Sequence, residues 1–244
     1  MSENRSEPEQ EHARKVRDMF AEISARYDLL NHLLSGNMDK RWRRRVAGEI
    51  RSGLKSDDRI LDVACGTGDL ALTLFESTGA RIVGTDFCRP MLELAARKAL
   101  TENSPIRYVE GDALKLPFLN DAFDAATIGF GLRNLSNIED GLSELFRVLK
   151  PGGRVAVLEF SKPVLPGFRV LFQFYFVRVL PLLGGIVSGS RSAYQYLPAS
   201  VSNFPDQKRL ASLMIEIGFG QVVYQNLTGG IAAIHLGTKP QRLP

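Results

Sequence analysis

The sequence contains few of the residues that metal sites and disulfide frameworks require. Only two of its 244 residues are cysteine and only three are histidine. Cys65 and Cys88 cannot build a disulfide framework, and His12, His32 and His235 show no metal-ligand spacing. We therefore expect neither a stapled fold nor a structural zinc site.

Charge of one sign and long hydrophobic runs are also lacking. The 31 basic and 27 acidic residues leave a net charge of +4, which does not require a nucleic-acid partner. Residues 1–15 contain no apolar core of a secretory signal, so we expect a cytoplasmic protein. The most apolar stretch, residues 168–187, is interrupted by Arg169, Arg178 and Pro181. A membrane span needs roughly 20 continuous apolar residues, so this stretch is not expected to be one.

The chain is long enough for one larger α/β domain, which we place at residues 12–244. Residues 1–11 lack apolar anchors and are predicted to form a disordered tail. Apolar residues then recur from Val16 to Ile23 with the period of an amphipathic helix, and helical patterns continue to about residue 51. The domain is therefore predicted to begin with helices.

After Arg59 short apolar runs alternate with helical patterns, which predicts βαβ units and a parallel sheet. The expected strands cover residues 59–64, 81–86, 106–112, 123–130 and 154–160. Two further apolar segments flank the turn sequence Thr228-Gly229-Gly230. They predict an antiparallel hairpin that closes the sheet.

The glycine-rich sequence LDVACGTGD at residues 61–69 follows the first expected strand and opens a helix. Gly66 and Gly68 allow a tight turn and a close approach of the backbone to a ligand. Asp86 ends the next expected strand, where a carboxylate can accept hydrogen bonds from both ribose hydroxyls. This arrangement predicts a nucleoside-containing ligand.

Two kinds of nucleoside ligand fit the glycine-rich turn, because it also matches the dinucleotide fingerprint. Asp69 at the start of the helix would repel a pyrophosphate but suits a cation such as S-adenosylmethionine. Asp112, after the third expected strand, offers an acceptor to the adenine amino group. Both carboxylates favour the methyl donor. A dinucleotide oxidoreductase and a non-catalytic cofactor-binding subunit remain alternatives.

Segments outside the turn are distinctive as well, namely RYDLLNHLLS, GDALKLPF, GFGLRN, YQYLPASV and NLTGGIAAIHLGTKP. On these segments the chain resembles the class I S-adenosylmethionine-dependent quinone C-methyltransferases that act on demethylmenaquinone and on a methoxy-polyprenyl-benzoquinol. The resemblance implies a three-layer αβα Rossmann-like fold. Its seven-stranded, mostly parallel sheet would have the order 3-2-1-4-5-7-6 with strand seven antiparallel. Helical caps would lie at residues 12–51 and 163–216.

The resemblance also implies cofactor contacts on this chain. With the glycines of the turn included, the predicted cofactor-binding residues are Tyr27, Gly66, Thr67, Gly68, Asp86, Phe87, Asp112, Ala113 and Gly129. Tyr27 would close over the cofactor, although an ordinary half-buried aromatic is the alternative. Gly129 stands where many members of the ubiquinone pathway have serine. In that detail the chain resembles members that serve menaquinone alone, so activity on benzoquinols is left open.

Methylation of a ring carbon requires loss of a proton from a neighbouring hydroxyl. Arg133 and Asn134 follow the fourth expected strand, at the sheet edge where doubly wound folds bind ligands. We expect Arg133 to stabilise the phenolate, with a proton relay through water, and Asn134 to orient the ring oxygen. The alternative is that both residues only tie a loop by backbone hydrogen bonds. Asp69 is the third candidate catalytic residue, in cofactor placement or the relay. No metal is expected, because the methyl donor is already activated.

Two segments point to larger partners. The apolar residues 168–187 could line a groove for the prenyl tail of a naphthoquinol or rest on the inner face of the membrane. The alternative is a core helix of the substrate cap. The basic run at residues 40–45 fits RNA, anionic lipid or solvent. RNA is disfavoured, because the chain lacks the Asn/Asp-Pro-Pro-aromatic tetrad of adenine methyltransferases and the catalytic cysteine motifs of cytosine enzymes. A homodimer is left open.

Overall fold

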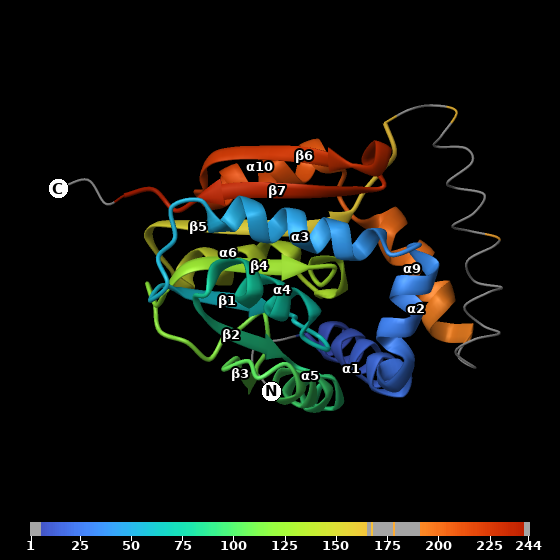
Figure 1. Cartoon of the computed structure of the whole chain (residues 1–244). Coiled ribbons are helices and arrows are strands. Elements are labelled where there is room, and N and C mark those ends of the chain that lie inside the picture. Colours follow the sequence, from blue (N-terminus) through green and yellow to red (C-terminus); the bar gives the residue numbers. More distant parts are fainter. Residues whose placement is uncertain (1–5, 165–166, 168–177, 179–190, 242–244) are drawn as a thin grey trace.

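A computed structural model of the chain describes residues 6–164, 167, 178 and 191–241 (Figure 1). Its centre is a seven-stranded sheet of order β3-β2-β1-β4-β5-β7-β6, in which β7 runs antiparallel to both neighbours. The strands are β1 Arg59–Val63, β2 Arg81–Asp86, β3 Arg107–Glu110, β4 Phe123–Gly129, β5 Leu149–Phe160, β6 Gly220–Leu227 and β7 Ala232–Thr238. The expected order and the closing hairpin are both confirmed.

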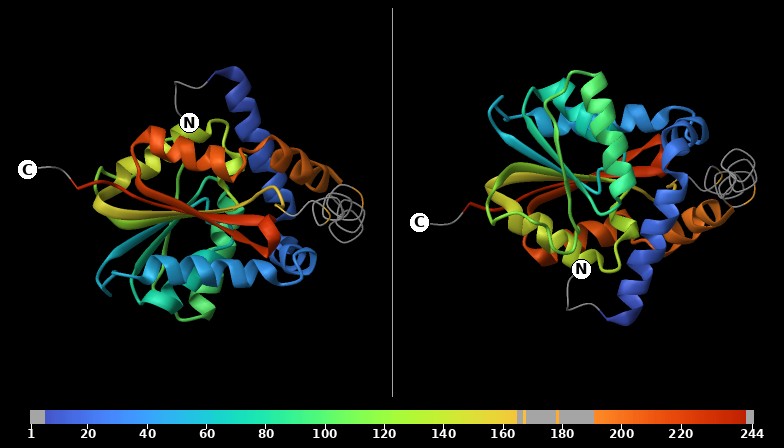
Figure 2. Two further views of the ribbon diagram at one scale, coloured as in Figure 1. Left: turned by 90° about the horizontal axis from the view of Figure 1, so that it is seen from above. Right: turned by 90° about the horizontal axis from the view of Figure 1, so that it is seen from below.

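Helices cover both faces of the sheet and one of its edges (Figure 2). They are α1 Glu7–Ile23, η1 Ser24–Arg26, α2 Tyr27–Leu34, α3 Met38–Arg51, α4 Asp69–Thr78, α5 Arg89–Thr101, η2 Leu132–Asn134, α6 Ile138–Val148, α9 Arg191–Asn203, α10 Gln207–Ile217 and η4 Thr228–Gly230. Helices α3, α4 and α5 pack on one face, and α6 and α10 pack on the other. Helices α1, α2 and α9 gather at the edge where the parallel strands end.

Alternating side chains of β1 explain how one short strand stabilises both layers. Ile60 packs into the cluster that contains Trp42 and Leu74, whereas Leu61 packs into the cluster that contains Leu142 and Leu145. Ile60 and Leu61 are both fully buried, as expected for a central parallel strand with helices on both faces. The sheet therefore forms a rigid base for the residues at its carboxyl edge.

Helix α1 begins earlier than the sequence predicts. The helix begins at Glu7, inside the segment for which a disordered tail is predicted, so that prediction is wrong for residues 7–11. The carboxylate of Glu9 accepts hydrogen bonds from the backbone N–H and the hydroxyl of Ser6. With Pro8 in the first turn, this capping box starts the helix without apolar anchors. Residues 1–5 lie outside the described part of the chain.

Strand β5 also begins earlier than residue 154, where the strand is expected. Leu149 already pairs with Phe123 of β4, and the register then shifts before Arg154 pairs with Ala125. The proline and glycines at residues 151–153 therefore form an irregularity within the strand. The expected apolar segment at residues 168–187 lies outside the described residues except for Arg178. In the described part of the chain, no helix is long and apolar enough to cross a bilayer.

Candidate functional site

A pocket lies at the carboxyl edge of the sheet, between the strand ends and helices α1 and α2. It holds about 740 Å³ of empty space, part of it open to solvent, which is within the usual range for a cofactor site. Most of the predicted site residues line it, namely Tyr27, Gly66, Asp86, Phe87, Asp112, Ala113, Gly129 and Asn134. The remaining four, Thr67, Gly68, Asp69 and Arg133, do not.

Asp86, at the end of β2, is fixed by the backbone around it. Its Oδ2 accepts a hydrogen bond from the N–H of Gly66 at 2.8 Å, and its Oδ1 accepts one from the N–H of Cys88 at 2.9 Å. Burial raises the pKa of this carboxyl, and these backbone hydrogen bonds oppose the rise. The carboxylate is 7% exposed and lines the pocket, so it can accept from the two hydroxyls of a ribose.

Gly66 and Gly68 have different structural roles in the glycine-rich turn. Gly66 lines the pocket, and a Cβ added to it would lie 3.9 Å from the ring of Tyr27. Gly68 is the N-cap of α4 at φ +83° and does not line the pocket. A Cβ there would lie 2.5 Å from the hydroxyl of Tyr108 and 3.1 Å from the Cβ of Ala95. Gly68 therefore permits close packing of the turn against β3 and α5, and does not line the cofactor pocket.

Tyr27 begins α2 and contributes to the roof of the pocket. Its ring meets that of Phe20 from α1 edge to face, with 5.9 Å between the centroids. Burial raises the pKa of the Tyr27 hydroxyl, so this group stays neutral. Across the pocket, the Asp112 carboxylate accepts a hydrogen bond from the N–H of Leu114 at 2.9 Å, which fixes the loop after β3.

Thr67 and Asp69 are part of a polar network below the pocket. The Thr67 hydroxyl donates to Asp28 of α2 at 2.5 Å. The ammonium of Lys98, on α5, lies 2.5 Å from the other oxygen of Asp28 and 2.6 Å from Asp69. We call this the Asp28–Lys98 bridge. It connects α2, which carries Tyr27, to the glycine-rich turn, α4 and α5.

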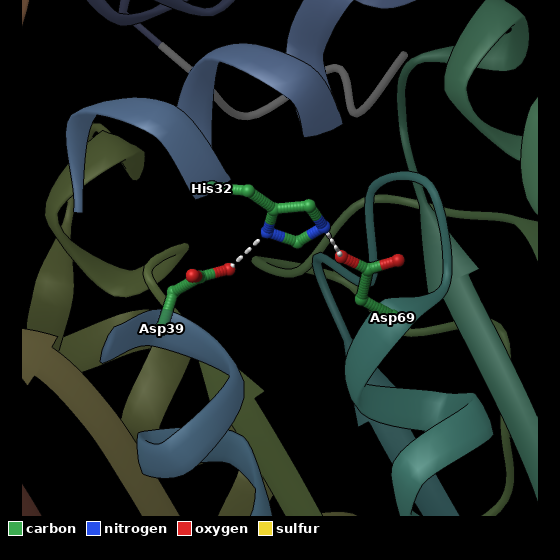
Figure 3. Close-up of side chains that lie close together, drawn as sticks. All are labelled: His32, Asp39 and Asp69. Carbon is green, nitrogen blue, oxygen red and sulfur yellow. Dashed lines mark hydrogen bonds and ion pairs between the residues drawn. The ribbon is translucent and has the colours of Figure 1, made fainter. Parts of the chain in front are cut away.

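Figure 3 shows a second part of this network, in which His32 lies between two carboxylates. Its Nδ1 is 2.7 Å from Asp39, and its Nε2 is 3.8 Å from Asp69. Histidine spacing in the sequence gave no sign of this group, whose three residues are close enough to bind a metal ion. However, the guanidinium of Arg43 already lies 2.5 Å from Asp39 and 3.4 Å from Asp69. The site therefore suits an ion-pair network better than a divalent cation.

Arg133, in η2, is held by a buried acid that the sequence analysis missed. Its Nη1 lies 2.7 Å from Glu159 and donates to the carbonyl of Phe130, while its backbone N–H also donates to Glu159. Burial raises the pKa of the Glu159 carboxyl, and the charge of Arg133 opposes the rise. The sequence signal that could have identified Glu159 is that it is the single acid in the apolar strand sequence RVAVLEF.

A second pocket lies beside the first, between α1, η2 and α9, and encloses about 880 Å³, part of it open to solvent. Arg133 and Tyr196 line this pocket, together with His12 of α1. Leu135 and Ser136 line both pockets and form their common wall. The arrangement provides two adjacent sites, one with a carboxylate suited to a ribose and one with a buried arginine.

The sequence matches the ubiE/COQ5 methyltransferase family over residues 8–239. It is 52% identical to the demethylmenaquinone methyltransferase of Thermus thermophilus, over 91% of this chain and all of that protein. It is 46% identical to the ubiquinone/menaquinone biosynthesis C-methyltransferase UbiE of Geobacter sp. strain M21, over 94% of this chain and 98% of that protein.

Solved structures with low sequence identity share the fold. The [4+2]-cyclase SpnF is 19% identical and superposes with a TM-score of 0.69, over 94% of this chain and 97% of its own. Phosphoethanolamine N-methyltransferase 2 of Haemonchus contortus, in complex with S-adenosyl-L-methionine, is 16% identical with a TM-score of 0.61, over 81% of this chain and 52% of its own. The family match and the close relatives extend over nearly the whole sequence, so this chain belongs to the ubiE/COQ5 methyltransferase family.

Proposed function

We propose that this chain methylates a ring carbon of reduced demethylmenaquinone, using S-adenosylmethionine as the methyl donor. The observation that carries the proposal is the pair of adjacent pockets with Leu135 and Ser136 as common wall. Asp86 in the first pocket suits the ribose of the donor, and Arg133 in the second suits an oxygen anion of the acceptor. Relatives named demethylmenaquinone methyltransferase support the choice of acceptor.

The size and the lining residues of the donor pocket suit S-adenosylmethionine. Asp86 supplies hydrogen-bond acceptors for ribose, and Asp112 supplies one for the adenine amino group. Ala113, Tyr27 and Phe87 offer apolar surface to a planar base. The bound donor supplies an electrophilic methyl group on a sulfonium. Asp69 helps to position it indirectly, through the ion pairs that hold α2 and the glycine-rich turn together.

In the reaction, a ring carbon attacks the methyl carbon, so that a carbon–carbon bond forms while the sulfur–methyl bond breaks. The ring carbon is nucleophilic only when the neighbouring hydroxyl has lost its proton. The guanidinium of Arg133 stabilises the resulting oxygen anion by its positive charge, while the proton leaves through water. Asn134 lines the donor pocket beside the common wall, where its amide, which also donates to the carbonyl of Phe130, would orient the same oxygen from the donor side. After the transfer, the ring carbon loses its own proton to solvent and the ring regains aromaticity.

The first experiment is a turnover assay with labelled S-adenosylmethionine. Reduced demethylmenaquinone and reduced methoxy-polyprenyl-benzoquinol analogues are offered side by side, with bulk RNA as a control. Methylation of the naphthoquinol is expected, and Gly129 favours the naphthoquinol over the benzoquinol. Methylation of both quinols would extend the function to ubiquinone precursors. Labelling of RNA alone would overturn the proposal.

Arg133→Ala tests the role of the arginine. This variant should bind S-adenosylmethionine with unchanged affinity, because Arg133 does not line the donor pocket, and its kcat should fall at least 100-fold, on the scale of a lost electrostatic contact in the transition state. Arg209→Ala on α10, where Arg209 pairs with Glu216 near the surface, is the matched control. Turnover of Arg133→Ala at the rate of this control would contradict the proposed role.

We also propose that the helical end of the molecule contacts the inner face of the membrane, where a prenylated quinol is dissolved. Leu29 and Leu33 lie one turn apart on α2 and are 61% and 59% exposed. Lys40, Arg41 and Arg44 are exposed at the adjoining start of α3 and suit anionic headgroups. Association of two copies into a homodimer stays a prediction.

A further inference from the structure

Buried polar atoms without a partner concentrate in the second pocket and at its border with the first. Among the described residues, ten buried side-chain nitrogen or oxygen atoms make no hydrogen bond. Four of them lie in or beside η2 and on the facing helix α9: Arg133 Nε, Asn134 Oδ1, Ser136 Oγ and the Tyr196 hydroxyl. A buried polar group without a partner is costly, so such a concentration points to a bound polar ligand.

Tyr196 lines the second pocket from α9, and Arg133 lines it from η2. Its hydroxyl is buried, and Arg133 and Glu159 are the charged groups close enough to affect it. Burial raises the pKa of this hydroxyl, so it stays protonated and can donate a hydrogen bond. Leu135, Ile138 and Ala199 line the same pocket and give it apolar surface. The pocket therefore has two polar groups and apolar sides, which suits a flat ring with an oxygen at each end.

We propose that the Tyr196 hydroxyl donates a hydrogen bond to the ring oxygen that Arg133 does not stabilise. The inference rests on the proposed function and adds a residue that determines its specificity. Tyr196 selects arenes with two opposed ring oxygens over phenols with one. A phenol would leave the buried Tyr196 hydroxyl without a partner, whereas a quinol would accept its hydrogen bond. Sites that hydrogen-bond a substrate hydroxyl reject analogues without it for this reason.

The test uses two acceptors that differ in one oxygen. One is a short-chain prenylated 1,4-naphthoquinol, and the other is the naphthol that keeps only the hydroxyl beside the carbon to be methylated. For the unaltered protein, kcat/KM should be at least roughly tenfold higher for the quinol, on the scale of one buried hydrogen bond. Tyr196→Phe should lower kcat/KM for the quinol by a similar factor, chiefly through KM, and leave the naphthol rate unchanged.

Two controls separate this role from a structural one. Tyr224→Phe on β6, where the ring stacks on His235 away from both pockets, should keep the preference for the quinol. Tyr196→Phe should bind S-adenosylmethionine in calorimetry as the unaltered protein does, because Tyr196 does not line the donor pocket.

Three outcomes would overturn the inference while the proposed function stands. They are equal rates of the unaltered protein on both acceptors, an unchanged preference in Tyr196→Phe, and an equal loss on both acceptors in that variant. The first of these needs no variant, so the inference is testable even if Tyr196→Phe folds poorly. Methylation of neither acceptor by the unaltered protein would instead overturn the proposed function itself.

Discussion

At the scale of single residues, the site depends on carboxylates that are buried for different reasons. Glu159 is 1% exposed and is compensated by Arg133, which donates one hydrogen bond to each of its carboxylate oxygens. Asp62 in β1 is equally buried, but only its Oδ1 is bonded, by the hydroxyl of Thr127 at 2.7 Å. The first carboxylate fixes the side chain of Arg133, the proposed anion-stabilising group, whereas the second is a cost to the fold when ionised.

Glu159→Gln should reduce turnover by loosening Arg133. The amide has the same shape but no charge, so the guanidinium loses its main electrostatic anchor and points less accurately at the acceptor. We expect kcat to fall roughly 10- to 100-fold with unchanged affinity for S-adenosylmethionine, measured by single-turnover kinetics and calorimetry. Glu216→Gln, in the surface pair of α10, should have no effect. Full activity of Glu159→Gln would show that Arg133 is positioned by its backbone contacts alone.

Asp62→Asn should change how stability depends on pH. Burial raises the pKa of Asp62 from 3.8 to about 7, so the folded state holds a proton that the unfolded state releases. The protein therefore loses stability as pH rises from about 4 to 7, and the asparagine variant lacks this loss. Relative to the unaltered protein, the variant should gain roughly 2–3 kcal/mol between pH 5 and pH 8, as measured by urea denaturation. A difference that is constant with pH would contradict this.

At the scale of elements, the sheet was predictable and the helical cap was only partly so. Strand positions followed from apolar runs bounded by turn residues, and the strand order followed from the family resemblance. The starts of α1 and β5 were missed because a capping box at Ser6 and a paired Leu149 replaced the usual signals. Ion pairs such as that of Lys98 with Asp28 join residues far apart in sequence, so no local sequence pattern predicts them.

The Asp28–Lys98 bridge should control how firmly α2 closes over the donor. Lys98→Met keeps the length of the side chain but removes both ion pairs, so Tyr27 is held less tightly over the pocket. We expect the Kd for S-adenosylmethionine to rise roughly 3- to 10-fold, because two partly exposed ion pairs are each worth up to about 1 kcal/mol. Arg97→Met, an exposed neighbour on α5, is the control. Equal affinities of the two variants would exclude such a role for the bridge.

At the scale of the whole molecule, both pockets and the exposed leucines of α2 lie at one end, beyond the carboxyl ends of the parallel strands. The loop that carries Leu119 lies at the opposite edge of the sheet, before the amino end of β4, and Leu119 is 83% exposed. An acceptor with a long prenyl tail would therefore enter from the end that carries Leu29, Leu33 and the basic start of α3.

The position of both pockets and of the exposed α2 leucines at one end of the molecule predicts which surface leucines affect membrane binding. Replacing Leu29 and Leu33 by serine should reduce co-sedimentation with anionic phospholipid vesicles, whereas Leu119→Ser should not. Raising the salt concentration should weaken binding of the unaltered protein, because Lys40, Arg41 and Arg44 contribute through screened charges. Equal binding of all variants would place the contact elsewhere on the molecule.

Helix α1 covers both pockets at once, since Phe20 and Ala13 line the first and His12 lines the second. The His12 ring also lies within 3.3 Å of the Asn134 carbonyl, at the wall between them. A ligand in either pocket therefore packs against the same helix and restricts its motion, so the second ligand meets a helix that is already ordered. The two substrates should bind with positive cooperativity, and thermodynamic linkage requires each to strengthen the other by the same factor.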